Sequence, residues 1–120
     1  PIQLTLSQFQ YGFANGMEES EQQAAYEEYL VPESRRVGRA TTTKAAQLQF
    51  DVAREPLLLI AGGIDRTITA RLNYANFQAY RRTPAITDFR QFPQRNHWTI
   101  GMSDWQSVAN YIAQWIEAQR

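Results

Sequence analysis

The sequence predicts an α/β fold, and two observations in its second half carry that prediction. A continuous apolar run from Pro56 to Ala61 ends at a glycine pair, as expected for a strand that is buried on both faces of a parallel sheet. Two helical patterns then alternate with a second strand-like segment, and this order indicates a right-handed βαβ unit with a further covering helix. The length of 120 residues suits one domain or a piece of a larger one.

The first part of the chain is predicted to be helical, and residues 33–50 are mixed in character. Thr5 and Gln8 have the spacing of a capping box, and apolar residues recur after them at helical intervals until glycines interrupt the pattern. A second helix is expected over residues 18–30, with early glutamates that the helix dipole favours and with Pro32 beyond its end. Residues 43–48 match one more short helix.

The elements expected after residue 50 follow in a regular order. A strand over residues 57–61 leads through a polar turn to a helix over residues 70–82, which a threonine–proline pair ends. A second strand is expected over residues 86–92, and its two charged residues suit the edge of a sheet. The last helix follows Ser103, which forms a capping-box pair with Gln106 and precedes a clear apolar stripe.

The composition excludes several classes of function. The absence of cysteine excludes disulfides, thiolate zinc sites and a cysteine nucleophile, and a single histidine excludes a multi-histidine metal site within one chain. Twelve basic and twelve acidic side chains give no net charge, which argues against a nucleic-acid partner. The apolar runs are too short to span a membrane and no signal peptide is evident, so we expect a cytoplasmic protein without metal or cofactor.

Two residues stand where α/β folds place their chemistry. Asp65 follows the carboxyl end of the first predicted strand, and His97 follows the second. If the strands are parallel neighbours, the aspartate can accept a hydrogen bond from one imidazole nitrogen and leave the other nitrogen free as a base. The alternative is that Asp65 caps a turn and that His97 is an ordinary loop histidine.

Several aromatic residues are candidates for a substrate pocket. Trp98 neighbours the histidine, and Phe9, Phe13 and Tyr26 could line an acyl pocket beneath a lid. The alternative is that these rings only hold two short helices together.

Two segments resemble the α/β-hydrolases of the serine esterase and lipase type. Residues 56–67, PLLLIAGGIDRT, are similar to the late strand and acid loop of that family, and residues 92–101, FPQRNHWTIG, are similar to its histidine loop. The resemblance implies a partial hydrolase core in residues 51–120, with two late strands and flanking helices, and a helical cap or lid segment in residues 1–50. It also implies Asp65 as the triad acid, His97 as the general base, a glycine pair that allows a tight turn before the acid, and a small ester or acyl substrate.

The family's nucleophile is not matched in this chain. None of the five serines lies in a Gly-x-Ser-x-Gly elbow, and the segment around Ser103 lacks the second glycine. The chain also opens at Pro1 without an initiator methionine. The resemblance therefore implies that the nucleophile and oxyanion donors belong to an absent N-terminal half, and the isolated chain is expected not to be catalytically competent.

A strand with one neighbour keeps an open edge, so we expect a partner. This partner is either a second chain that supplies the N-terminal hydrolase half or a second copy in a homodimer. The alternative function is a non-catalytic, oligomeric interaction or small-ligand-binding protein that derives from a truncated hydrolase and retains the Asp65–His97 pair as a relic.

Overall fold

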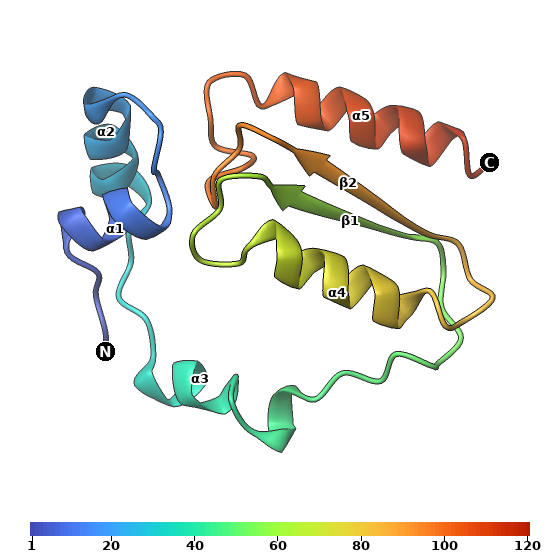
Figure 1. The fold of residues 1–120 in the computed structure, drawn as a ribbon. Helices are drawn as coiled ribbons and strands as arrows, with labels where there is room; N and C mark the ends of the chain where they lie inside the picture. Colours follow the sequence, from blue (N-terminus) through green and yellow to red (C-terminus); the bar gives the residue numbers. More distant parts are fainter.

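The computed structural model describes residues 1–120 and combines helices with a small parallel sheet (Figure 1). This architecture is consistent with the predicted α/β class. Five α-helices, one 3-10 turn and two strands follow one another along the chain: α1 (Leu6–Gly12), α2 (Glu19–Tyr29), α3 (Arg35–Ala40), η1 (Lys44–Ala46), β1 (Leu57–Gly62), α4 (Ala70–Tyr80), β2 (Thr87–Phe92) and α5 (Gln106–Glu117).

The sheet consists of β1 and β2 alone, paired in parallel with Leu57 opposite Thr87 and Gly62 opposite Phe92. The chain passes from one strand to the other through α4, as the alternating pattern predicted. Because there are only two strands, each has one unpaired edge. The edge position expected for β2 is therefore present, and β1 is an edge strand as well.

Helices α4 and α5 cover opposite faces of this sheet (Figure 1). Successive side chains of a strand point to opposite faces. Phe89 of β2 packs on Phe77 of α4 with ring centroids 5.6 Å apart. The preceding residue, Asp88, accepts a hydrogen bond of 2.7 Å from the indole Nε1 of Trp115 in α5. The second half of the chain is thus a three-layer unit with the sheet in the middle.

Helices α1 and α2 pack on each other and lie beside the loops that follow the two strands (Figure 1). Their contact forms a small core of Phe9, Ala14 and Ala25. The predicted capping box is present, since the Gln8 amide donates to Thr5 Oγ1 and the Thr5 amide donates to Gln8 Oε1. The N-terminal helices are therefore close to the end of the sheet where the sequence placed the chemistry.

Two local predictions need correction. The expected helix over residues 43–48 is only the single turn η1. The capping box of Ser103 and Gln106 does not form, because α5 begins at Gln106 with Trp105 at its N-cap position and no side-chain cap. Instead, the buried guanidinium of Arg95 binds both the carbonyl and the carboxylate of Asp104 and fixes the turn before the helix.

The chain exposes more surface than a compact protein of its size. Its accessible area is 8724 Å², whereas a folded monomer of 13.9 kDa exposes about 6,700 Å². Its radius of gyration is 16.1 Å, against about 13.6 Å for a compact chain of this length. Only nine residues are buried. Hydrophobic burial within the chain is consequently small.

None of the helices has both the length and the apolar character that crossing a bilayer requires.

We expect Trp115→Phe to lower the free energy of unfolding by about 1.5–3 kcal/mol, because the Asp88 carboxylate loses a charge-assisted hydrogen bond. Urea denaturation followed by circular dichroism measures the change. Trp105→Phe is the matched control: this indole is half-exposed and makes no side-chain hydrogen bond, so its loss should cost within about 0.5 kcal/mol. Equal losses in the two variants would contradict a stabilising role for the Asp88 contact.

Candidate active site

The structure brings Asp65 and His97 together at the carboxyl ends of the strands. Asp65 lies in the loop after β1, and His97 lies in the loop after β2. The imidazole Nδ1 is 2.9 Å from the Asp65 Oδ2 atom. An ionised carboxylate can only accept hydrogen bonds, so Nδ1 is the donor of this contact, and in the neutral imidazole Nε2 is then the atom with a free lone pair. This is the juxtaposition that parallel strands predicted.

The Asp65 carboxylate is held in place by its own loop. Its second oxygen, Oδ1, accepts hydrogen bonds from the backbone amides of Thr67 at 2.7 Å and Ile68 at 2.9 Å. The side chain is only 6% exposed, while that of His97 is 28% exposed. These contacts leave Oδ2 directed at the imidazole, and His97 Nε2 makes no hydrogen bond within the chain. The alternative that Asp65 caps a turn is therefore also present, and the two roles use different oxygens.

The glycine pair at the end of β1 allows the two loops to cross closely. A Cβ atom on Gly62 would lie 2.6 Å from the carbonyl oxygen of Asn96, and one on Gly63 would overlap the carbonyl of Pro93. Neither glycine has a positive φ angle. The expected tight turn is present, since the Asp65 amide donates to the Gly62 carbonyl at 3.3 Å. The close approach of two backbones is a second reason for glycine at these positions.

Buried polar side chains brace the histidine loop. Arg95, which is 4% exposed, donates to the carbonyl of Thr99 at 3.0 Å and pairs with Asp104 at 2.7 Å. Asn96 is fully buried, and its Oδ1 atom accepts from the Trp98 amide at 2.8 Å. Neither residue could be singled out from the sequence, because polar loop residues show no periodicity and resemble solvated ones.

His97 opens into a cavity of about 510 Å³, whose lining consists of Phe13, Tyr29, His97, Trp98, Ile100 and Gly101. Phe13 meets the imidazole edge to face, with ring centroids 4.7 Å apart and planes at 86°. The hydrogen bond to Glu28 and its negative charge raise the pKa of Tyr29 above the usual value. Apart from the imidazole, the surroundings of the cavity are mostly aromatic and aliphatic.

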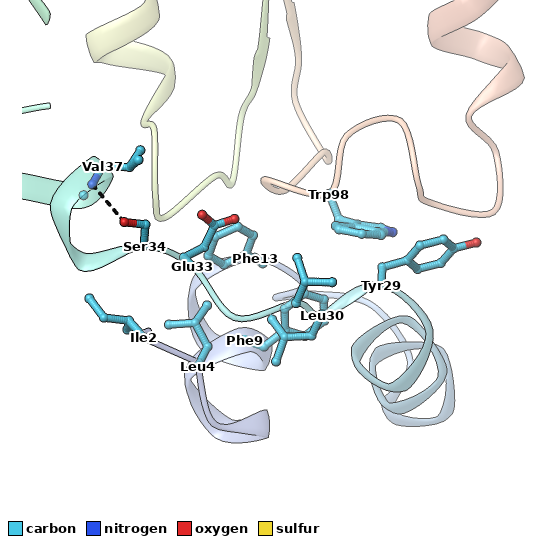
Figure 2. A pocket seen from close by; sticks show the side chains of 12 residues that line it. Ile2, Leu4, Phe9, Phe13, Tyr29, Leu30, Glu33, Ser34, Val37 and Trp98 are labelled. Carbon is cyan, nitrogen blue, oxygen red and sulfur yellow. Dashed lines mark hydrogen bonds between the residues drawn. The ribbon is translucent and has the colours of Figure 1, made fainter. Parts of the chain in front are cut away.

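A second cavity of about 410 Å³ adjoins the first through Phe13, Tyr29 and Trp98 (Figure 2). Nine of its twelve lining residues are hydrophobic. In Figure 2 the indole of Trp98 comes from the histidine loop, and the other side chains come from the N-terminal segment. Both volumes lie within the roughly 300–1,000 Å³ that is usual for small-molecule sites.

Three of the four predicted pocket residues line these cavities. Phe13 and Trp98 contact both cavities, and Phe9 lines the apolar one. Tyr26 lines neither, contrary to expectation. Its hydroxyl donates to the Leu4 carbonyl at 3.0 Å and its ring packs edge-on against Phe9, so it stabilises the α1–α2 contact instead.

Neither a serine nucleophile nor a metal cluster accompanies the pair. His97 makes no hydrogen bond to any of the five serines, and Ser34, at the rim of the apolar cavity, accepts from the Val37 amide of its own helix. No three His, Asp or Glu side chains gather at one point.

No family model matches the chain, and no match was found among curated proteins or solved structures. The resemblance to α/β-hydrolases therefore stays a prediction from the two loop segments.

We expect Gly63→Ala to lower the free energy of unfolding by about 1–3 kcal/mol, because its methyl group would overlap the Pro93 carbonyl and force the loops apart. Gly38→Ala provides the contrast. Gly38 lies inside α3 with open space around it, so alanine should raise stability by up to about 1 kcal/mol through helix propensity. Thermal or urea unfolding measures both variants, and a neutral Gly63→Ala would contradict the close crossing.

Proposed function

We propose that this chain supplies the acid and the general base of a Ser-His-Asp triad for the hydrolysis of a carboxylic ester or related acyl substrate. The serine nucleophile and the oxyanion donors come from another polypeptide segment. The single observation that supports this proposal is the 2.9 Å contact between His97 Nδ1 and Asp65 Oδ2, with the other carboxylate oxygen held by two backbone amides. Such a pair fixes the imidazole tautomer and leaves Nε2 able to take a proton.

The chemistry of the two residues follows from that arrangement. His97 Nε2 removes the proton of the serine hydroxyl while the serine oxygen forms a bond to the substrate carbonyl carbon. Asp65 stabilises the imidazolium that results, and the imidazolium returns the proton to the alkoxide leaving group as the ester bond breaks. A water molecule then repeats the sequence on the acyl-enzyme, which releases the acid and restores the serine.

The cavities favour a substrate with an apolar group. The 410 Å³ cavity adjoins the one that His97 lines, so a carbonyl at the imidazole could place its acyl or alcohol substituent among Phe9, Phe13 and Trp98. Burying each methylene group of such a chain contributes about 0.8 kcal/mol to binding.

The surface of the chain supports the need for a partner. The accessible area exceeds that of a compact monomer, and β1 carries the apolar side chains of residues 57–60 at only partial burial beside an unpaired edge. A strand from a second chain, or from a second copy, would pair with that edge and cover apolar surface.

A second candidate function is the binding of a small apolar ligand without catalysis. The observation in its favour is that the 410 Å³ cavity is built from the N-terminal segment and Trp98, and that neither Asp65 nor His97 lines it. Binding of an apolar ligand that is unchanged by His97→Ala, together with a failure of the labelling experiment below, would favour this function over hydrolysis.

In the labelling experiment the chain is mixed in solution with a second polypeptide, which carries a Gly-x-Ser-x-Gly nucleophile and the N-terminal half of a hydrolase core. We expect a serine-directed fluorophosphonate to label the complex and not this chain alone, and a nitrophenyl ester to be hydrolysed only by the complex. Asp65→Asn should lower the rate of ester hydrolysis by the complex about 10⁴-fold, because an amide facing Nδ1 favours the wrong imidazole tautomer.

Asp88→Asn is the matched control for that substitution, since Asp88 bonds to Trp115 on the face of the sheet and does not contact the loops. It should leave the labelling rate unchanged. Labelling of the isolated chain that is lost in His97→Ala would contradict the claim that the nucleophile comes from elsewhere.

The mass of the chain in solution tests the partner. We expect the isolated chain to self-associate at micromolar concentration, or to bind a hydrophobic dye strongly, because of its exposed apolar surface. Light scattering coupled to size-exclusion chromatography measures the mass. A stable, well-folded monomer that does not bind the dye would contradict the need for a second chain.

A further inference from the structure

Asn15 connects the two loops that carry Asp65 and His97, although it lies in the N-terminal segment. Its side-chain Nδ2 donates to the carbonyl of Ile64 at 2.8 Å, and Ile64 directly precedes Asp65. The main-chain carbonyl of Asn15 accepts a hydrogen bond from Nδ2 of Asn96 at 2.9 Å, and Asn96 directly precedes His97. One residue thus contacts the immediate neighbour of each member of the pair.

Both asparagines are buried between the N-terminal segment and the two loops. Asn96 is fully buried and Asn15 is 8% exposed. A buried hydrogen bond of this kind is costly to lose, because the group left behind stays unpaired. The Asn15 Oδ1 atom is buried without a partner, so the side chain is oriented by its Nδ2 bond to Ile64 alone.

We infer that Asn15 is a positioning residue, which sets the relative placement of the acid loop and the histidine loop and thereby the tautomer of His97. This inference rests on the proposed role of the Asp65–His97 pair. A displacement of either loop by a fraction of an ångström lengthens the 2.9 Å contact between His97 Nδ1 and Asp65 Oδ2. A longer contact stabilises the Nδ1–H tautomer less. The N-terminal segment accordingly contributes to the acid–base chemistry as well as to the cavities.

The chain offers a direct readout, because His97 is its only histidine and gives the only imidazole signals in a nitrogen-15 spectrum. At about pH 9 an ordinary imidazole is neutral. The ratio of the two neutral tautomers can then be read from the shifts of the two ring nitrogens. In the wild-type chain we expect the Nδ1–H tautomer to dominate.

In Asn15→Ala we expect the ratio of the Nδ1–H to the Nε2–H tautomer to fall ~3-fold or more, the size of effect that follows from losing about one net hydrogen bond. Asn15→Leu fills the volume of the side chain without a donor and should give the same change if the alanine variant does not fold. The matched control is Gln22→Met. Gln22 donates to the Ala14 carbonyl at 2.9 Å, a similar bond one residue away that touches neither loop, so the tautomer ratio should not change.

Each outcome decides the inference. A wild-type ratio in a folded Asn15 variant overturns it, and so does an equal shift in Gln22→Met, which would show a general loosening of the segment. If both Asn15 variants unfold, the inference is tested on the wild-type chain by measuring solvent exchange of the Asn15 side-chain amide protons. Rapid exchange would contradict the hydrogen bond to Ile64 and so overturn the inference. A wild-type chain without the Nδ1–H tautomer contradicts the proposed function itself, and this result is distinct from the other three.

Discussion

The close crossing of the loops that follow β1 and β2 is the constraint on which the rest of this structure depends. It requires glycine at residues 62 and 63, since a methyl group on either would meet the backbone of the histidine loop. The crossing brings the Asp65 carboxylate to His97, and it is reinforced by the bond from the Ile64 amide to the Arg95 carbonyl at 3.0 Å. The parallel pairing of the two strands brings both loops to the same end of the sheet.

The electrostatic arrangement at this crossing is self-consistent. A carboxylate that is 6% exposed would be unfavourable without partners, and Asp65 has three, two from backbone amides and one from the imidazole. Because the amides orient the carboxylate independently of the histidine, the aspartate is preorganised for its partner. A preorganised negative charge of this kind stabilises the imidazolium that forms when a histidine acts as a general base.

The N-terminal segment is joined to this site by polar as well as apolar contacts. The Thr67 hydroxyl donates to the Gly12 carbonyl at 2.7 Å, and the Trp98 amide lies 3.1 Å from the Phe13 carbonyl. Phe13 itself packs on the imidazole. These bonds reach the loops on both sides of the pair. The segment therefore forms one wall of the cavities and is held to the same loops that carry the proposed chemistry.

Local patterns explain which parts could be predicted. The apolar run of β1, the amphipathic stripe of α5 and the Thr5 capping box depend on neighbouring residues in the chain, and each was predicted close to its observed place. The capping prediction at Ser103 was wrong because Arg95, a buried arginine nine residues before Asp104, binds Asp104 and organises that turn. Tyr26 was assigned to a pocket because periodicity does not distinguish a ring that lines a cavity from one that packs between helices.

The sequence by itself determined the α/β class, the order of the strands and of every α-helix except α3, and the identity of the two residues at the ends of the strands. Only the tertiary structure decided that Asp65 Oδ2 and His97 Nδ1 lie 2.9 Å apart, that the glycine pair serves a backbone crossing, and that Asn15 links both loops. The physical reason is the same in each case. These contacts join residues between 30 and 81 positions apart in the chain, and no local periodicity predicts a partner at that separation.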